Sequence, residues 1–599
     1  MFSPNMYGEI FEKLCECNAA MVKSMQQKPI NNPMQEALVQ LNSQDLGQWV
    51  EEAAQNPLKM MDTQIQWWHD QMNIWQTSLM QAVHPEIDDA ISIEKGDKRF
   101  DDPAWKEQVL FNVLKQSYLL FSRNMLQMID NSNSLEKSTK ERLNFFTRQM
   151  INALSPTNFL STNPELIRLT FESKGENLVK GMEQLQEDMT LSADVLKVRL
   201  TNRDAFKVGT DLASTPGEVV FQNELIELLQ YHPSTDTVAK RPILIVPPFI
   251  NKYYVMDMRE QNSLVRWLVG QGHSVFMISW VNPDESLADY EFGHYATKGV
   301  IPALEKIEDL TGEQHVNAIG YCVGGMLLAT TAAYMVSKRM KQRIKSMTLL
   351  TTMLEFSNPG EIGVFINEPT ITAIETQNKI RGYMDGRLIE STFSLLRENS
   401  LFWNYYVKNY LKGESPLDFD LLYWNSDSTN IAAACHNDIL RKLYLNNLLK
   451  EPKGIEIDGV GIDLSKIKVP VYFLSAKDDH IAGWESTFTG SKYLKGKVTF
   501  VLGESGHIAG VINPPAKNKY GYWAGGDINA QDAQTWVKSA EHHTGSWWTH
   551  WQAWSEEQDT AEKVPARKVA KEASLGAAPG SYVLQKLPVE SAMEQEKAS

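Results

Sequence analysis

The hexapeptide Gly320-Tyr321-Cys322-Val323-Gly324-Gly325 decides the fold expected of this chain. It has the form G-x-C-x-G-G, a nucleophile elbow with cysteine where serine is usual. Residues 315–319 before it alternate like a strand, and residues 326–329 after it begin an apolar helical run. A sharp strand-to-helix turn requires small neighbours, because larger side chains would clash beside the strained nucleophile. The hexapeptide alone leaves one alternative open, a buried cysteine in an ordinary glycine turn.

Short apolar runs on both sides of the elbow predict a buried, mainly parallel sheet. They alternate with helical segments, which is typical of strands that are covered on both faces. The runs are residues 242–246, 275–278, 315–319, 347–350, 470–474 and 498–502. Between about 358 and 455 this rhythm stops and aromatic residues become frequent. The sequence therefore predicts an α/β-hydrolase fold in which that insert forms a cap over the active site.

The regions outside the sheet predict two further parts. The first is residues 1–205, whose helical periodicity predicts a helical N-terminal domain. The second is residues 561–599, which are rich in Ala, Lys, Glu and Pro and are predicted to form a loose tail. Residues 206–560 between them form the predicted catalytic domain. One helical stripe alternates spacings of four and three, and consists of Met61, Ile65, Trp68, Met72, Trp75 and Leu79. Its ordinary interpretation is a core or helix-pairing face, and the alternative is a face that docks on a hydrophobic surface or partner helix.

The composition excludes several classes of protein. The chain has 599 residues, 43% of them hydrophobic, and a net charge of −16, which disfavours nonspecific nucleic-acid binding. Four cysteines are too few for a disulfide framework, so a reducing, cytoplasmic location is expected. Neither a secretory signal nor a transmembrane segment is recognisable. Cys15 and Cys17 have no nearby histidine, and no motif for a metal or a cofactor is present, so neither is expected.

A cysteine nucleophile needs a base, and the base needs an orienting acid. Both follow Cys322 in the order that this fold uses. The acid lies in Asp478-Asp479-His480, after one predicted strand, and His507 lies after the next. Loops that follow parallel strands meet at the carboxyl edge of the sheet, where such folds carry their chemistry. We assign Cys322 as nucleophile, Asp479 as acid and His507 as base, although each residue taken alone could be structural.

Two backbone N–H groups are candidates for an oxyanion hole. One belongs to Val323, directly after the nucleophile, and the other to Ile250 in the loop that follows the strand at 242–246. His480 is a rival base, but it precedes the last strand, so we expect it to support the site from beside Asp479. Cys435-His436 resembles a catalytic pair, but adjacent residues rarely face each other usefully, and we rank it below Cys322 and His507.

Cysteine at the elbow favours a transferase. If the acyl donor is a thioester, attack by a thiolate exchanges similar bonds, and the acyl-enzyme stays activated for transfer to an alcohol. A serine would form an oxygen ester and lose that driving force. Water as the acceptor is not excluded by this argument, so a hydrolase stays open at this point.

Seven segments together resemble the class I polyhydroxyalkanoate synthases. The similarity covers about residues 90–550 and includes P-P-x-I-N-K-x-Y-x-x-D at 247–257 and S-W-x-N-P at 279–283. It also includes the segments 320–325, 419–425, 478–481, 506–510 and 545–548. One departure stands out, because Gly483 precedes Trp484 where that family commonly has proline. A glycine would loosen the loop that carries Asp479 and His480.

The resemblance implies a reaction and partners. It implies that (R)-3-hydroxyacyl-CoA, chiefly 3-hydroxybutyryl-CoA, is joined into polyester with release of CoA, and that the chain grows as a thioester on Cys322 with His507 activating the hydroxyl. Trp424 matches the family's cap tryptophan, which is associated with the dimer. The helical domain matches the part associated with granules, granule proteins and dimer support. The resemblance therefore implies a homodimer in the cytoplasm at polyester granules.

Two other functions compete with this one. A depolymerase or thioesterase with a cysteine elbow would use the same three residues, but the helical domain and the 247–257 segment argue against it. A granule-coating scaffold is the second rival. The intact Cys322, Asp479 and His507 argue against it, because a scaffold has no need of all three.

Overall fold

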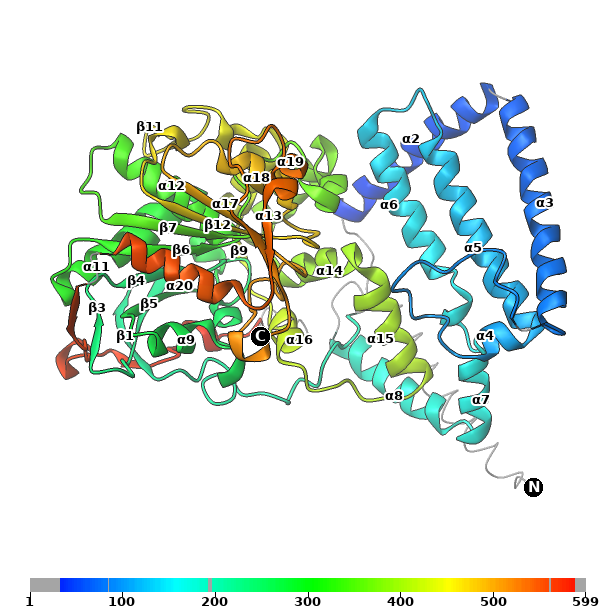
Figure 1. The fold of residues 1–599 in the computed structure, drawn as a ribbon, viewed down its shortest axis with the longest axis horizontal. Helices are drawn as coiled ribbons and strands as arrows, with labels where there is room; N and C mark the ends of the chain where they lie inside the picture. The colour runs from blue at the N-terminus through cyan, green and yellow to red at the C-terminus, as the bar shows by residue number, and fades with distance from the viewer. Residues whose placement is uncertain (1–32, 56, 85, 192–196, 560–561, 588–599) are drawn as a thin grey trace. The chain divides into compact units, whose positions relative to one another are not determined.

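The computed structural model describes residues 33–55, 57–84, 86–191, 197–559 and 562–587 (Figure 1). The chain divides into two compact units. The larger one contains residues 203–390 and 418–588, and the smaller one contains residues 1–202, 391–417 and 589–599. The predicted boundary at 205/206 lies close to the division at 202/203. Each unit is described by itself.

An eleven-stranded sheet forms the centre of the larger unit (Figure 1). Its order is β15-β14-β13-β12-β7-β6-β4-β5-β2-β1-β17, and the strands from β13 to β5 are parallel. The strands are β1 (Gly217–Gln222), β2 (Ile226–Tyr231), β4 (Ile243–Val246), β5 (Val275–Trp280), β6 (Val316–Tyr321), β7 (Ile344–Leu350), β12 (Val471–Ala476), β13 (Val498–Gly503), β14 (Tyr522–Ala524), β15 (Glu541–His543) and β17 (Gly576–Ala577).

All six apolar runs are confirmed as strands of this sheet, namely β4, β5, β6, β7, β12 and β13. Four of them, β5, β4, β6 and β12, are buried along their whole length, as expected of strands covered on both faces. The antiparallel strands at the two edges were not predicted. Their sequences mix polar and apolar residues, and their pairing depends on neighbours that are distant in the chain.

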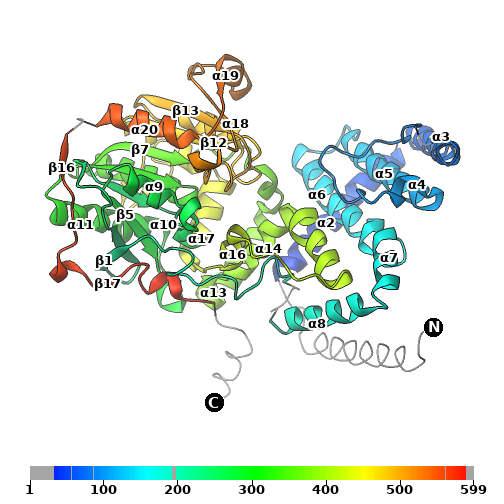
Figure 2. The same cartoon turned by 60° about the horizontal axis from the view of Figure 1, so that its bottom comes forward.

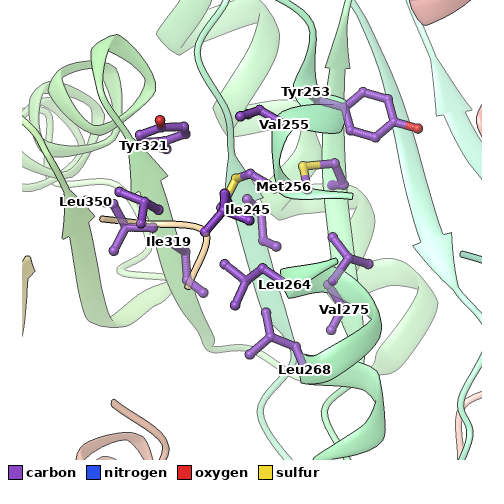
Figure 3. Packing of buried hydrophobic residues seen from close by; sticks show 14 of the residues in the cluster. Ile245, Tyr253, Val255, Met256, Leu264, Leu268, Val275, Ile319, Tyr321 and Leu350 are labelled. Atoms are coloured by element: carbon purple, nitrogen blue, oxygen red, sulfur yellow. The ribbon is translucent and has the colours of Figure 1, made fainter. Parts of the chain in front are cut away.

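Helices cover both faces of the sheet. Side chains of α9 (Leu264–Gly270) and α20 (Trp547–Gln558) share one buried cluster with Ile319 of β6, and Figure 3 shows the α9 part of it. The neighbouring Gly320 faces the other way, where a Cβ atom would lie 2.5 Å from the Cα of Gly325. Gly325 belongs to α12 (Val323–Ser337), so α12 covers the opposite face. Further helices of this unit are α10 (Phe292–His294), α11 (Ile301–Thr311), α18 (Trp484–Ser491) and α19 (Ala533–Ser539).

The C-terminal segment differs from the loose tail that was expected. Residues 562–587 run along the sheet as β16 (Lys563–Pro565), which pairs with β3 (Thr237–Ala239), and as β17, which pairs with β1 (Figure 2). Arg567 donates to the backbone oxygens of Ala239 and Lys240 and pairs with Glu313. The composition suggested a loose segment because its apolar residues are few, but backbone and charged contacts fix it.

The predicted cap at 358–455 is divided between the two units. Residues 391–417 group with the N-terminal helices, and the rest groups with the sheet. The elements of the insert are α13 (Glu368–Arg381), β8 (Tyr383–Met384), α14 (Gly386–Leu396), α15 (Asn404–Tyr406), α16 (Asp420–Ser426), β9 (Ile431–Ala432) and α17 (Ala433–Asp438), followed by a π-helix, η9 (Ile439–Leu445). Short strands β10 (Glu456–Ile457) and β11 (Val460–Gly461) follow.

The smaller unit is helical, as predicted. Its helices are α2 (Pro33–Gln55), α3 (Pro57–Gln81), α4 (Ala104–Glu107), α5 (Val109–Asp130), α6 (Lys137–Ala153), α7 (Pro164–Glu172) and α8 (Glu176–Leu191). Asn163 caps α7 by accepting from the N–H groups of Glu165 and Leu166. Residues 407–411 pack on α8, where Tyr410 donates to Asp188 at 2.6 Å. None of the described helices is long and apolar enough to cross a membrane.

The stripe on α3 is not a core face, so its ordinary interpretation was wrong. Its members, which expose 47–62% of their surface, are Met61, Ile65, Trp68, Met72, Trp75 and Leu79. The opposite side of α3 makes the contacts with α5, where Ile74 is fully buried, Gln71 donates to Ser117 and Ser78 donates to Asn112. The periodicity showed that two faces exist, but it did not show which one is covered.

Candidate functional site

Cys322 lies at the turn between β6 and α12 in a strained backbone conformation. Its φ is 53° and its ψ is −123°, which an L-residue rarely adopts. The side chain is 7% exposed. Strain of this kind persists only where the surroundings enforce it, and it gathers at functional sites. The predicted elbow is therefore present in the structure, with the cysteine at its apex.

The glycines of the elbow allow backbone to approach backbone. A Cβ atom on Gly324 would overlap the carbonyl groups of Val246 and Pro247, and one on Gly325 would overlap the side chain of Thr352. The loop after β4 is consequently packed directly on the first turn of α12. This contact brings the start of the 247–251 loop, one predicted source of an oxyanion donor, against the helix that begins with Val323, the other predicted source.

Asp479 and His507 form a buried pair at the carboxyl edge of the sheet. The Nδ1 atom of His507 lies 2.7 Å from Oδ2 of Asp479. The other carboxylate oxygen, Oδ1, accepts from the backbone N–H groups of Ile481 and Ala482, both at 2.8 Å. A carboxylate held at both oxygens fixes the orientation of the imidazole and directs its Nε2 away from the acid.

The charges of the site favour a protonated histidine. Burial lowers the pKa of His507, but the carboxylate of Asp479 and the sulfur of Cys322 outweigh it, so that the pKa is raised well above its usual value. The imidazole therefore interacts with both other members of the predicted triad. An imidazolium next to sulfur stabilises a thiolate.

The loop that carries His507 is fixed from three directions. The backbone N–H of Asp478 donates to the carbonyl of Ser505 at 2.9 Å, which joins the acid loop to the histidine loop. Glu504 accepts from the N–H of Gly521 at 2.8 Å. The ring of Tyr321 stacks on His507 with centroids 5.6 Å apart, and its hydroxyl donates to the carbonyl of His507.

The structure separates the neighbouring candidates. Asp478 is exposed, whereas Asp479 is buried and holds His507. His480 is half-buried beside Asp479, and its carbonyl lies against Gly360. Trp424, predicted to support the site from the cap, is buried in α16 and donates from Nε1 to the carbonyl of Lys252 at 2.7 Å. It is therefore attached to the 247–257 segment of its own chain.

One residue near Cys322 was missed by the sequence analysis. Tyr444, in η9 of the insert, interacts electrostatically with both Cys322 and Asp479, and burial together with these charges raises its pKa. Its ring packs edge-on against Phe356 at 4.8 Å. No pattern in the sequence distinguished it from the other aromatic residues of the insert, because its position depends on how the insert folds back over the sheet.

The pair Cys435-His436 is structural. Cys435 is fully buried in α17, and burial raises the pKa of its thiol. His436 accepts from Asn378 at its Nδ1, and burial lowers its pKa to about 4. Among the described residues no group of three or more His, Cys, Asp or Glu side chains is arranged to hold a metal ion. Cys15 and Cys17 lie outside the described residues.

Two family models match the chain. The model described as the N-terminus of poly-beta-hydroxybutyrate polymerase (PhaC) covers residues 96–268. The model described as alpha/beta hydrolase fold covers residues 241–514 and confirms the predicted fold of the larger unit. The first match begins in the helical unit and ends in α9, so it crosses the division between the units.

Three curated relatives are similar over most of the chain. The poly(3-hydroxyalkanoate) polymerase subunit PhaC of Rhizobium meliloti is 44% identical over 88% of this chain and 86% of the relative. The poly(3-hydroxyalkanoate) polymerase of Methylorubrum extorquens is 45% identical over 89% of this chain and 88% of its own length. The PhaC subunit of Cupriavidus necator is 41% identical over 82% and 83%.

We predict that His436 makes the protein less stable in mild acid. Its pKa is about 4 in the folded chain, against 6.5 for an ordinary histidine, so the unfolded chain binds the proton more tightly. The stability that the neutral histidine contributes to the folded chain is present above pH 6.5 and is lost as the pH falls towards 4. At pH 5 the loss is about 2 kcal/mol. Urea unfolding at pH 7.5 and 5 should show this difference in wild type and not in His436→Gln, and equal pH dependence in both would contradict it.

We predict that proline is tolerated at position 483. Gly483 has φ −49° and ψ 128°, and open space surrounds the position of a Cβ atom. Gly483→Pro should raise the free energy of unfolding by about 0.4–1 kcal/mol, because the unfolded chain loses freedom. Gly483→Ala is the control for the added side chain. Because Ile481 and Ala482 hold Asp479, enzymatic activity should stay near the wild-type rate, and a clear loss of stability or rate would contradict this account of the loop.

Proposed function

Because the chain belongs to the poly(3-hydroxyalkanoate) polymerase family, and is thereby an enzyme of acyltransferase type, we propose that it polymerises (R)-3-hydroxyacyl-CoA, chiefly 3-hydroxybutyryl-CoA, with release of CoA. The observation that carries this proposal is the position of Cys322 at a strained elbow in contact with the His507–Asp479 pair. We propose that these three residues are the catalytic triad. We also propose that the reaction uses no metal and no cofactor.

The first step in this proposal loads the enzyme. The thiolate of Cys322 attacks the carbonyl carbon of the acyl-CoA, a new C–S bond forms, and the C–S bond to CoA breaks. The CoA thiolate leaves and takes the proton from the His507 imidazolium. The raised pKa of His507 supports this order, since the proton is already on the imidazole when the substrate arrives. One thioester replaces another, so the acyl group stays activated.

The second step extends the polyester. The 3-hydroxyl of the next acyl-CoA gives its proton to His507 and its oxygen attacks the thioester carbonyl on Cys322. An ester bond forms and the thiolate of Cys322 leaves, which returns the nucleophile. The lengthened acyl-CoA then transfers back to Cys322 with release of its CoA. Asp479 holds the imidazole in the orientation that both proton transfers need.

The negative oxygen of each tetrahedral intermediate needs donors. We propose the backbone N–H groups of Val323 and Ile250 for this role. Val323 is the first residue of α12, so its N–H has no acceptor within the helix. Ile250 belongs to the loop whose start, at Val246 and Pro247, is packed on Gly324. Losing one such donor should lower the rate by about 10²–10³.

We further propose that the protein acts in the cytoplasm at the surface of polyester granules, as a homodimer that can bind granule-associated proteins. The exposed stripe of α3 supports granule attachment. It presents two tryptophans and two methionines on one face, which is a large apolar area to leave in water. Burial of these side chains against an aliphatic polyester would stabilise the attached state, as burial in a protein core does.

The central test follows thiol release from (R)-3-hydroxybutyryl-CoA together with turbidity. Wild type should release CoA while turbid polymer forms, and Cys322→Ala should do neither because it lacks the nucleophile. Cys435→Ala is the matched control, since Cys435 is buried away from the chemistry. Thiol release in a clear solution, with free hydroxy acid as product, would instead identify a thioesterase. Full polymer formation by Cys322→Ala would exclude the proposed role of this cysteine.

We predict that the α3 stripe binds polyester. The double variant Trp68→Ser and Trp75→Ser should bind preformed poly(3-hydroxybutyrate) particles about tenfold more weakly, because it loses two large apolar surfaces. Phe171→Ser removes an even more exposed aromatic from α7 and should bind like wild type. Sedimentation of purified protein with the particles measures this. Undiminished binding by the double variant would remove α3 from the attachment surface.

A further inference from the structure

The side chain of Glu227 holds the C-terminal segment to the sheet. Glu227 lies on β2 and is 2% exposed. Its carboxylate accepts from the N–H of Ser581 at 3.0 Å, from the hydroxyl of Ser581 at 2.6 Å and from the N–H of Tyr582 at 3.1 Å. A buried carboxylate is costly unless such donors surround it. The segment therefore supplies the groups that this carboxylate needs.

Glycine at position 580 makes the approach possible. Its φ is 80°, and a Cβ atom there would overlap the carboxylate of Glu227. The tyrosine that follows continues the attachment, since the hydroxyl of Tyr582 donates to the carbonyl of Asn223 at 2.6 Å. The segment 576–587 is thus attached by specific contacts where it crosses β2.

Near residue 585 the same segment contacts the side chain of Lys252. The Nζ atom of Lys252 donates to the carbonyl of Gln585 at 2.7 Å and pairs with Asp427 of the insert at 2.8 Å. Asp427 also accepts from the hydroxyl of Tyr254 at 2.8 Å. The side chain of Lys252 is 5% exposed. A buried ammonium group needs all of its acceptors, because a missing one leaves part of the charge uncompensated.

Lys252 connects this network to the loop beside the nucleophile. Its carbonyl accepts from Trp424, and its neighbour Asn251 forms a bridge with Ser428 of the insert. Ile250, the proposed oxyanion donor, lies two residues earlier in the chain. The position of this loop therefore depends on contacts with the insert and with the C-terminal segment, as well as on its packing against Gly324.

We propose that the segment 576–587 is a positioning element of the active site, which sets the 247–252 loop through the contact of Gln585 with Lys252. The catalytic part of this inference rests on the proposed function, because it assumes that the loop supplies an oxyanion donor. The mechanical part, in which the C-terminal segment holds the 247–252 loop in place, does not rest on the proposed function. Glu227 anchors one end of the segment. Loosening that anchor should therefore make the 247–252 loop less ordered, although Glu227 itself touches no reacting group.

The test uses the full-length chain with Glu227→Gln. This substitution keeps the size of the side chain but removes the charge to which the three donors of the C-terminal segment bind. Glu572→Gln is the matched control, because Glu572 is an exposed glutamate in the same C-terminal region. Hydrogen exchange is measured over 576–587 and over 247–254, and single-turnover acylation is measured with (R)-3-hydroxybutyryl-CoA.

The inference predicts faster hydrogen exchange in both segments of Glu227→Gln. It also predicts that acylation is slowed about tenfold. This is less than the 10²–10³-fold loss of rate expected when an oxyanion donor is removed, because the loop is displaced only part of the time. KM should change little, and Glu572→Gln should match wild type in all three readings. Faster exchange in 576–587 with unchanged exchange in 247–254 and unchanged acylation would overturn it. So would unchanged exchange in 576–587, because Glu227 would then not be the anchor.

A milder variant covers the case in which Glu227→Gln does not fold. Ser581→Ala removes the 2.6 Å hydrogen bond to Glu227 and leaves the backbone contacts in place. It should raise exchange in the same two segments by a smaller factor, and the same outcomes decide for or against the inference. If wild type itself released no CoA, the proposed function would fail, while the exchange measurements would still test the coupling.

Discussion

The close approach of backbone to backbone at Gly324 is the constraint on which the site depends. With no Cβ atom there, the first turn of α12 lies against the carbonyl groups of Val246 and Pro247. This packing brings the loop after β4 against the helix that begins directly after the strained Cys322. Strain of this kind persists where the surrounding structure over-determines the backbone, as is usual for functional turns. The elbow and the proposed oxyanion loop therefore share this contact, and the insert and the C-terminal segment hold the loop further along.

The electrostatics of the site build on that geometry. Asp479 is held by two backbone donors and by His507, so its carboxylate is fixed beside the imidazole. The dry surroundings strengthen the interaction of His507 with the sulfur of Cys322. The proposed exchange of thioesters needs a proton for the leaving thiol, and the raised pKa of His507 supplies a group that can hold it. Lys252 is a second buried charge, and its acceptors Asp427 and Gln585 hold the surrounding segments in place.

Local patterns in the sequence predicted the parts of the structure that depend on local properties. The buried strands are mainly apolar, and the elbow has its glycines, so both could be read from the residues. The α3 stripe was misjudged because periodicity defines a face and not what covers it, and Trp68 is exposed. The C-terminal segment was misjudged because its order comes from Glu227, more than 300 residues away in the chain. Tyr444 was missed for the same reason, since only the folded insert brings it near Cys322.

The identity of the acylated residue tests the central claim most directly. After a single turnover with (R)-3-hydroxybutyryl-CoA, acid quenching and proteolysis, mass spectrometry locates the acyl group on the chain. This account predicts a thioester on the peptide that contains Cys322, formed more slowly in Asp479→Asn, because the imidazole then lacks the carboxylate that holds and charges it. An acyl group on another residue, or CoA release without any acylated peptide, would contradict it.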